Sequence, residues 1–409
     1  MWIHLLACAR PVVEVTPGDD PVNVATVTVD MDSTLEWGLD TSYGHKAAIS
    51  DSYDLLGLLA DTRYHVRAVT PDGRTSDDVA FRTNPLPEDL PALEIEGADD
   101  PDAPYTLWSI SVADQDLSAV YLLDPDAGIR WYHLTDGLVL AAHATLDGAG
   151  VAIQVSRVAG EEAGDATTLD IVPWSGDALV LDHPLGHHDF VELPDGTFAA
   201  IVEVQGKFEG RAVIGDAIEI LDRDGGRREL WNAFGSVRLE KNEGWTLDPA
   251  DWTHANGIDY SPDRDLFALS LFRQQQVVLF DSDAAPHGLF GAEGDWTIQD
   301  DPGFGPQHGP RFTEDGLSLF DNAGAGASRW VSYALGAGTA DPIAEVGEPW
   351  GDQSLVGGDG LERKDGSVVT TWGDLGYLLT TSSEGEVLRV VRTRPTGLAG
   401  RVGTLDDPF

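Results

Sequence analysis

The sequence predicts an all-β protein, a six-bladed β-propeller preceded by a small N-terminal β-sandwich. Three observations support this fold class. The 409-residue chain is rich in glycine (46) and proline (23), as turn-rich β proteins are. Short apolar runs alternate with polar residues at a period of two, which is typical of half-buried strands. One strand–turn–strand unit recurs from about residue 98 to the end, as expected of a repeat architecture.

The first segment, residues 1–10, reads MWIHLLACAR. Its Leu-Leu-Ala-Cys run resembles a bacterial lipobox, in which the cysteine is lipidated after signal cleavage, although the segment is short and lacks a basic start. The alternative is a chance apolar N-terminus. The lipobox interpretation predicts a lipid anchor at Cys8 and an extracytoplasmic protein, periplasmic or at the cell surface. Cys8 is the one cysteine of the chain, so an intramolecular disulfide cannot form.

Residues 11–84 are predicted to form the β-sandwich. The stretch VNVATVTVDM alternates with period two, and AVTPDG followed by DVAFRT indicates a hairpin. Leu58, Ala60, Thr62 and Tyr64 alternate in a pattern that resembles the tyrosine corner of fibronectin type III domains, where the tyrosine hydroxyl ties a loop to a strand. A proline-rich stretch, NPLPEDLP, then indicates a stiff linker over residues 85–97.

Residues 98–409 contain the repeats that predict the propeller. Three copies are clear: HHDFVELPDGTFAAIV at 187–202, HANGIDYSPDRDLFALSL at 254–271 and QHGPRFTEDGLSLFDN at 307–322. A fourth copy at 357–372 has Gly358 where two others have histidine, and a weaker fifth begins at His143. Copies recur every 45 to 65 residues or so, roughly the length of a four-stranded blade, and this predicts about six blades. A large sandwich or a β-helix is the structural alternative.

The repeats place His188, His254 and His308 near the starts of blade-lining strands. In a propeller these starts meet at one mouth of the central channel, so we expect the three histidines to converge. Arg273 lies between two apolar strands of the second copy, and such an arginine either reaches solvent or faces an anion. Beside three histidines, the anion is the favoured interpretation.

Three histidines and an arginine fit two kinds of site. Histidine is the commonest transition-metal ligand, but the arginine repels a cation and Asp189 is the one carboxylate in the repeat frame. The second kind is an oxyanion site, in which Arg and imidazoles hold sulfate-like or phosphate-like oxygens and a neutral imidazole attacks. The second interpretation predicts neither a metal nor a cofactor.

The segments HHDFVELPDG, DWTHANGIDYSPDRDLFALSLFRQQQVVLFD and QHGPRFTEDGLSLFDN resemble the bacterial arylsulfate sulfotransferases, and the resemblance covers nearly the whole chain after the first dozen residues. It implies a β-sandwich followed by a six-bladed propeller. It also implies a sulfate-accepting nucleophile at His308, with His254, Arg273 and His188 as further catalytic residues. The family often has Ser-Arg-His around the arginine, whereas this chain has Phe-Arg-Gln.

The resemblance implies transfer of a sulfuryl group from an aryl sulfate donor to a phenolic acceptor through a sulfohistidine, in ping-pong fashion. His187, Asn256 and Trp252 are the residues we expect to bind substrate, although tryptophans also pack between propeller blades. His254 is expected to give a proton to the leaving phenolate and later to take one from the acceptor.

Two alternatives remain open on the sequence. One is a non-catalytic extracytoplasmic propeller that binds a ligand or partner protein, and the other is a metal-dependent hydrolase or lactonase of the propeller type. The formal net charge of −45 disfavours nucleic acid and anionic lipid headgroups as partners. It also opposes an anionic ester, so the site needs a locally positive pocket.

Overall fold

The fold is described from a computed structural model, which covers residues 10–112, 117–157, 167–238, 243–247, 249–322, 327–406 and 408–409. The predicted lipidation site, Cys8, lies outside these residues. Apart from α1 (Ala233–Ser236) and two short 3-10 turns, η3 (Glu243–Thr246) and η4 (Phe272–Gln274), the regular structure of the described part is β. None of the described helices is long and apolar enough to cross a membrane.

The N-terminal part consists of two antiparallel sheets around one core. Their strand orders are β1 (Val13–Pro17), β2 (Ala25–Val29), β5 (Ser52–Leu55) and β4 (His45–Ile49), β3 (Ser33–Gly38), β6 (Arg63–Val69), β7 (Val79–Arg82). Alternate residues of both sheets, such as Val27 and Val66, are fully buried in this core. The Tyr64 hydroxyl accepts a hydrogen bond from the Leu59 amide at 2.8 Å, so it ties a loop to strand β6 as the sequence predicts.

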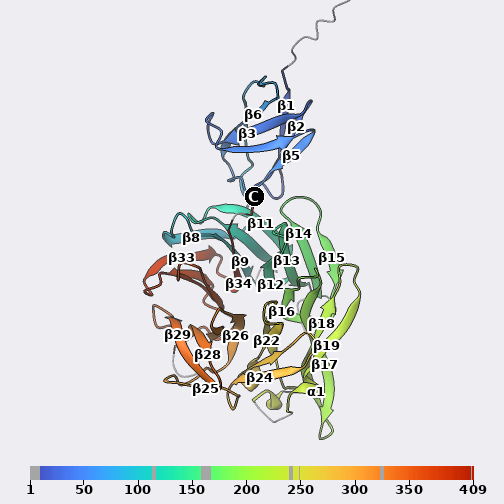
Figure 1. The fold of residues 1–409 in the computed structure, drawn as a ribbon, viewed down its shortest axis with the longest axis vertical. Helices are drawn as coiled ribbons and strands as arrows, with labels where there is room; N and C mark the ends of the chain where they lie inside the picture. Colours follow the sequence, from blue (N-terminus) through green and yellow to red (C-terminus); the bar gives the residue numbers. More distant parts are fainter. Residues whose placement is uncertain are drawn as a thin grey trace, which may run out of the picture.

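The described residues from 92 onward form six sheets of four or five strands, which surround a common centre in Figure 1. The first sheet contains β34 (Leu398–Leu405), β9 (Tyr105–Val112), β10 (Leu117–Leu123) and β11 (Ile129–Asp136), and the second contains β12 (Leu138–Ala144), β13 (Gly150–Ser156), β14 (Thr167–Pro173) and β15 (Leu179–Asp182). The third contains β16 (Gly186–Glu192), β17 (Phe198–Phe208), β18 (Arg211–Leu221) and β19 (Arg227–Asn232), with β20 (Ala250–Asp251) beside β18, and the fourth contains β21 (Ala255–Ser261), β22 (Leu266–Leu271), β23 (Gln276–Phe280) and β24 (Pro286–Gly291). The fifth contains β26 (Gln307–Phe312), β27 (Gly316–Asp321), β28 (Arg329–Leu335), β29 (Thr339–Gly347) and β25 (Thr297–Ile298), and the last contains β30 (Asp359–Glu362), β31 (Val368–Trp372), β32 (Tyr377–Thr381), β33 (Val387–Arg394) and β8 (Ala92–Gly97). The architecture is propeller-like.

Aspartate carboxylates close the turns that separate these strands. In the turn 222–226, Asp222 Oδ1 accepts hydrogen bonds from the amides of Asp224 at 3.0 Å and Gly226 at 2.7 Å. A Cβ on Gly226 would lie 2.4 Å from Asp222 Oδ2, so a larger residue here would have to displace the carboxylate that closes the turn. The turn at 124–128 repeats the pattern, with Asp124 accepting from the Gly128 amide at 2.7 Å. Such Asx turns are one reason for aspartate between the strands of this chain.

Strands from opposite ends of the chain complete two of the sheets. The C-terminal strand β34 is the innermost strand of the first sheet, where it pairs with β9. Strand β8 pairs with β33 as the outermost strand of the last sheet. The predicted linker 85–97 is therefore wrong for residues 92–97. Their partner strand lies almost 300 residues further along, and local sequence does not reveal it.

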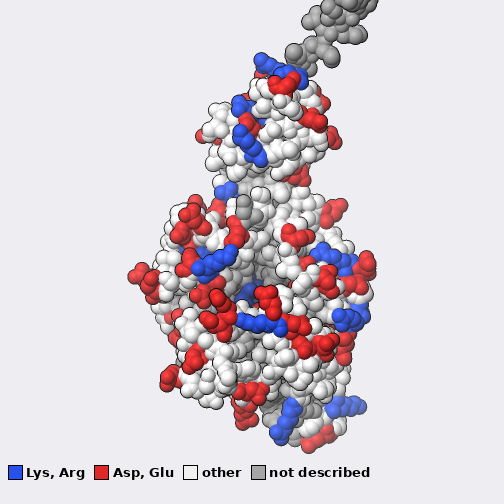
Figure 2. All heavy atoms as spheres, in the orientation of Figure 1, with Lys and Arg blue, Asp and Glu red and all other residues white. Residues whose placement is uncertain are grey.

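The surface carries the acidic excess of the composition. Figure 2 shows Asp and Glu spread over the visible face, with Lys and Arg in small groups among them. Buried charge is paired instead: Asp99 lies 2.9 Å from Arg363 and 3.1 Å from Arg389, and all three side chains are at most 2% exposed. The carboxylate of Asp99, which lies just after β8, thus pairs with two arginines of the last sheet.

We predict that Asp99→Asn lowers the free energy of unfolding by about 3–5 kcal/mol, because it leaves two buried guanidinium groups without their anion. Urea unfolding followed by tryptophan fluorescence measures the loss. The control is Asp406→Asn, which removes an exposed ion pair with Lys364 at 3.2 Å and should change stability little. Equal effects of the two substitutions would contradict the prediction.

Candidate functional site

The three predicted histidines lie close together at the inner ends of neighbouring sheets. The rings of His188 and His254 are 4.9 Å apart between centroids. The Phe272 ring lies 5.4 Å from that of His254 and 5.5 Å from that of His308, so it connects the two. The convergence that the repeats predict is therefore present.

The repeat frame is less regular than predicted at the second copy. His188 and His308 precede their turn aspartates by seven residues, whereas the residue at this distance from Asp263 is Asn256. His254 stands two residues earlier and reaches the cluster from just before β21. Its backbone is left-handed with φ 49°, as is that of His188 with φ 59°, which is uncommon for a side chain other than glycine. Local backbone strain thus helps to aim both rings.

His308 is buried, with 9% of its surface exposed. Its Nδ1 lies 2.6 Å from Oδ1 of Asn322. Burial lowers the pKa of His308 to about 4, and the nearby charge of Arg401 adds to this shift while the bond to Asn322 opposes it. The imidazole is therefore neutral at pH 7, the form in which it can act as a nucleophile.

His188 belongs to a chain of hydrogen bonds that ends on a carboxylate. Its Nδ1 lies 2.7 Å from Nδ1 of His187, and Nε2 of His187 lies 2.9 Å from Asp216 Oδ1. The other oxygen of Asp216 accepts from the Thr253 hydroxyl and the Ala255 amide, both at 2.6 Å. Burial and neighbouring cationic groups lower the pKa of His188 well below its ordinary value, so this ring is neutral as well.

His254 and Arg273 share one carboxylate, that of Asp251. Its Oδ2 lies 2.8 Å from Nδ1 of His254 and 3.1 Å from Nε of Arg273. Burial opposes ionisation of Asp251, but these two hydrogen bonds hold its pKa below the ordinary value. The side chain of His254 is 34% exposed, so its ring can be reached from the first cavity described below.

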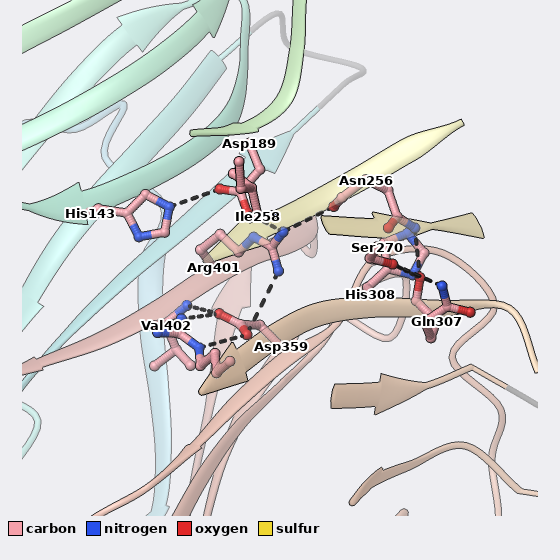
Figure 3. A network of polar contacts seen from close by, with 12 residues as sticks. His143, Asp189, Asn256, Ile258, Ser270, Gln307, His308, Asp359, Arg401 and Val402 are labelled. Carbon is pink, nitrogen blue, oxygen red and sulfur yellow. Dashed lines mark hydrogen bonds and ion pairs between the residues drawn. The ribbon is translucent and has the colours of Figure 1, made fainter. Parts of the chain in front are cut away.

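A second cation, Arg401 of β34, lies between Asp189, Asn256 and Asp359 (Figure 3). Its Nη2 is 2.5 Å from Asp189 and donates to the Asn256 carbonyl at 2.9 Å, while Nη1 is 3.7 Å from Asp359. His143 Nε2 lies 2.9 Å from the other oxygen of Asp189. Sequence reasoning included His187 but missed Arg401, Asp359, Asp251 and Asn322.

A signal for this network exists in the repeats. Asp189 and Asp359 each stand six residues before a turn aspartate, and the two intervening copies have Gly257 and Gly309 at the same place. Acidic residues at equivalent positions of inner strands indicate a buried cation, but nothing in the frame identifies Arg401 as that cation.

Two cavities meet at His188. One, of about 250 Å³, is lined by Leu185, His187, His188, Glu203, Ile214, Asp216, Asp251 and His254. The other, of about 270 Å³, has an aliphatic wall and a polar end; it is lined by Leu138, Val139, Leu140, His188, Asn256, His308, Val356, Gly357, Gly358, Leu398, Ala399, Gly400 and Arg401. The second cavity therefore combines a neutral imidazole, a guanidinium and an apolar surface.

Two of the predicted substrate-binding residues differ in placement. Asn256 lines the second cavity, and its Nδ2 donates to the Gln307 carbonyl at 2.7 Å. Trp252 is fully buried in the hydrophobic core, with its ring 5.3 Å from that of Phe234, and lines neither cavity. The prediction for Trp252 is wrong because a tryptophan between two sheets packs in the core instead of facing the channel. His187 lines the first cavity, and its Nδ1 shares a hydrogen bond with Nδ1 of His188.

In the described part of the chain, no group of three or more His, Cys, Asp or Glu side chains is arranged to hold a metal ion. The histidines point their Nδ1 atoms at neighbouring side chains, and the cation in the lining of the second cavity is the guanidinium of Arg401. The chemistry that these groups support best is binding of an oxyanion next to a neutral imidazole.

The fold and the site together define an all-β, propeller-like protein with an imidazole pocket suited to anions. A family model for arylsulfotransferase (ASST) matches residues 98–331, more than half of the chain, and the chain belongs to this family. Membership supports arylsulfotransferase activity in general, with an aryl sulfate donor and a phenol acceptor. No curated protein is significantly similar to the chain.

Several solved structures resemble the fold at low identity. A protein of unknown function from Bacteroides caccae is 13% identical, with a TM-score of 0.49, covering 73% of this chain and 98% of that one. Virginiamycin B lyase from Staphylococcus aureus is 11% identical, with a TM-score of 0.39, covering 77% and 99%. The Pseudomonas aeruginosa periplasmic gluconolactonase PpgL is 12% identical, with a TM-score of 0.40, covering 92% and 99%. Nothing about function follows from these likenesses.

The depressed pKa of His308 predicts a pH-dependent stability. The unfolded chain binds a proton at this histidine near its ordinary pKa of 6.5, whereas the folded protein does so only near 4. The contribution is therefore fully present above about pH 6.5 and is lost as the pH falls to about 4. When the pH is lowered from about 6.5 to about 4, we expect the free energy of unfolding to fall less in His308→Gln than in the wild type. Urea unfolding at several pH values measures this, and His287→Gln, at an exposed histidine, should follow the wild type.

Proposed function

We propose that this protein is a sulfotransferase that moves a sulfuryl group from a phenolic sulfate ester to a phenolic acceptor through a sulfohistidine on His308. The observation that carries the proposal is the buried, neutral imidazole of His308 in one cavity with Arg401, His188 and Asn256. A neutral imidazole is a nucleophile, and the guanidinium offsets the negative charge of the ester.

We further propose that the six sheets form a six-bladed propeller over residues 98–409, to which β8 adds an outer strand, with a fibronectin type III-like sandwich over residues 11–84. Pairing of β34 with β9 and of β8 with β33 supports joining of the first and last blades. The proposed setting is extracytoplasmic, on the basis of the lipobox-like segment that ends at Cys8.

In the first half-reaction, an imidazole nitrogen of His308 attacks sulfur and the bond from sulfur to the phenolic oxygen breaks. The electron pair of that bond leaves with the phenolate, which His254 protonates. A phenol has a pKa of about 10, so its anion leaves far more readily than an alkoxide. In the second half-reaction, His254 takes the proton from the acceptor phenol, and the new phenolate attacks the sulfur of sulfohistidine. The bond from sulfur to the His308 nitrogen breaks, and its electron pair returns to the imidazole, which is neutral again.

Charge stabilisation is expected to supply much of the rate, because sulfuryl transfer, like phosphoryl transfer, should have a loose transition state. Arg273, His254 and His188 are the proposed ligands of the sulfuryl oxygens. Arg273 holds Asp251 through its Nε, so its terminal Nη groups are the proposed contacts. The aliphatic wall of the second cavity is the proposed place of the aryl ring.

The first prediction of this mechanism is a covalent intermediate. After incubation with 4-nitrophenyl sulfate and no acceptor, intact mass spectrometry should show the added mass of one SO₃ group, and peptide mapping should place it on His308. His308→Ala should show neither the adduct nor transfer to phenol, whereas His287→Ala at an exposed histidine should show both. Full transfer by His308→Ala would overturn the mechanism, and ligand binding without an adduct would favour a non-catalytic propeller.

The second prediction concerns Asp251, which supports the proposed acid. We expect Asp251→Asn to slow transfer from phenyl sulfate by about 100-fold or more, because the proton donor is weakened. Transfer from 4-nitrophenyl sulfate should fall less, because its leaving group is more stable as an anion. Asp281→Asn breaks a matched but exposed Asp–His pair, that with His287 at 2.9 Å, and should change neither rate. Equal losses with both donors would contradict proton donation by His254.

A further inference from the structure

Asn322 contacts the proposed nucleophile directly and has no role in the mechanism so far. It follows strand β27 and is 2% exposed. Its Nδ2 donates to the carbonyls of Ser354 at 2.8 Å and Gly357 at 2.7 Å. Its Oδ1 faces Nδ1 of His308 at 2.6 Å.

These contacts determine which way the Asn322 amide points. A carbonyl oxygen only accepts hydrogen bonds, so the amide group beside two carbonyls must be the NH₂. The Ser328 hydroxyl holds the same loop, since it donates to the Asn322 carbonyl at 2.8 Å and accepts from the Ser354 amide at 2.9 Å. Asn322 therefore presents an oxygen to His308, held by two backbone segments.

The orientation of the amide determines where the proton of His308 lies. An amide oxygen accepts and cannot donate, so Nδ1 of His308 must carry the hydrogen. A neutral imidazole has one N–H, and Nε2 then has the free lone pair. The partner of His308 is a neutral amide, whereas the partner of His254 is the carboxylate of Asp251.

We propose that Asn322 is a positioning residue that holds His308 as the Nδ1–H tautomer and presents Nε2 as the attacking atom. The kinetic consequence rests on the proposed sulfotransferase function, whereas the tautomer itself does not. His308 and His254 would then have different roles because their partners differ: the amide of Asn322 orients the nucleophile, and the carboxylate of Asp251 orients the acid.

The first test reads the tautomer without any turnover. In protein labelled with ¹⁵N-histidine, long-range ¹H–¹⁵N correlation spectra near neutral pH should show His308 protonated at Nδ1 and unprotonated at Nε2. His308→Gln assigns the signal by its disappearance. A signal from the Nε2–H tautomer, or from a mixture of the two, would overturn the inference even if the wild type transfers sulfate. If the wild type fails to turn over, the sulfotransferase proposal fails and the tautomer is still measured.

The second test separates positioning from folding. Asn322→Leu should lower the rate of the 4-nitrophenol burst at least 10-fold with little change in KM, because the ring loses its fixed tautomer and orientation. Asn322→Asp keeps an acceptor but adds charge, so the acid limb of its pH–rate profile should move to higher pH. An unchanged burst rate in the leucine variant would overturn the positioning role.

A matched control for this test lies in the sandwich. Asn23 is fully buried and donates to two carbonyls in the same way, those of Leu58 at 2.6 Å and Ile129 at 2.8 Å. Asn23→Leu should lower thermal stability about as much as Asn322→Leu and leave the burst unchanged. A burst lowered equally in both variants would mean that lost stability explains the effect. If Asn322→Leu does not fold, the tautomer spectrum of the wild type decides the matter.

Discussion

The arrangement of the inner strands depends on the contacts that the buried guanidinium of Arg401 makes with two carboxylates. Arg401 brings a cation from the C-terminal strand to Asp189 and Asp359 of two other sheets. Glycines make the room for it: a Cβ on Gly257 would lie 2.7 Å from Nη2, and one on Gly309 would lie 2.8 Å from Nη1. Breaking such a buried pair is costly although its net contribution to stability is small, so the contact favours one arrangement of the inner strands.

The same cation shapes the chemistry of the pocket. Arg401 lines the cavity of His308 and His188 and, together with burial, keeps both rings neutral. Its own partners, Asp189 and Asp359, are held on the guanidinium. Because Asp189 and Asp359 balance much of this charge, an anionic ester inside a molecule whose net charge is −45 also needs the proposed contact with Arg273.

The histidines of the site differ mainly in what their Nδ1 atoms contact. His254 meets a carboxylate, His188 meets another histidine, and His308 meets an amide. The partner of one ring nitrogen influences how acidic an imidazole is. It also determines whether the other nitrogen presents a proton or a lone pair. These three partners are the basis on which we propose one histidine as the acid, one as a ligand and one as the nucleophile.

The sequence by itself determined the local features: strands with a period of two, turns closed by their own aspartates, and a repeat that aligns His188 with His308. These depend on neighbours a few residues away, so they are visible in the chain. Only the tertiary structure decided that β8 is a strand and that Trp252 packs in the core. It also decided that Asp251 and Asn322 contact histidines and that Arg401 lines the cavity of His188 and His308. Those facts depend on contacts across sheets, and Arg401 lies more than 200 residues from Asp189. A repeat frame predicts which backbone positions converge, but it cannot predict which side chain fills the space between them.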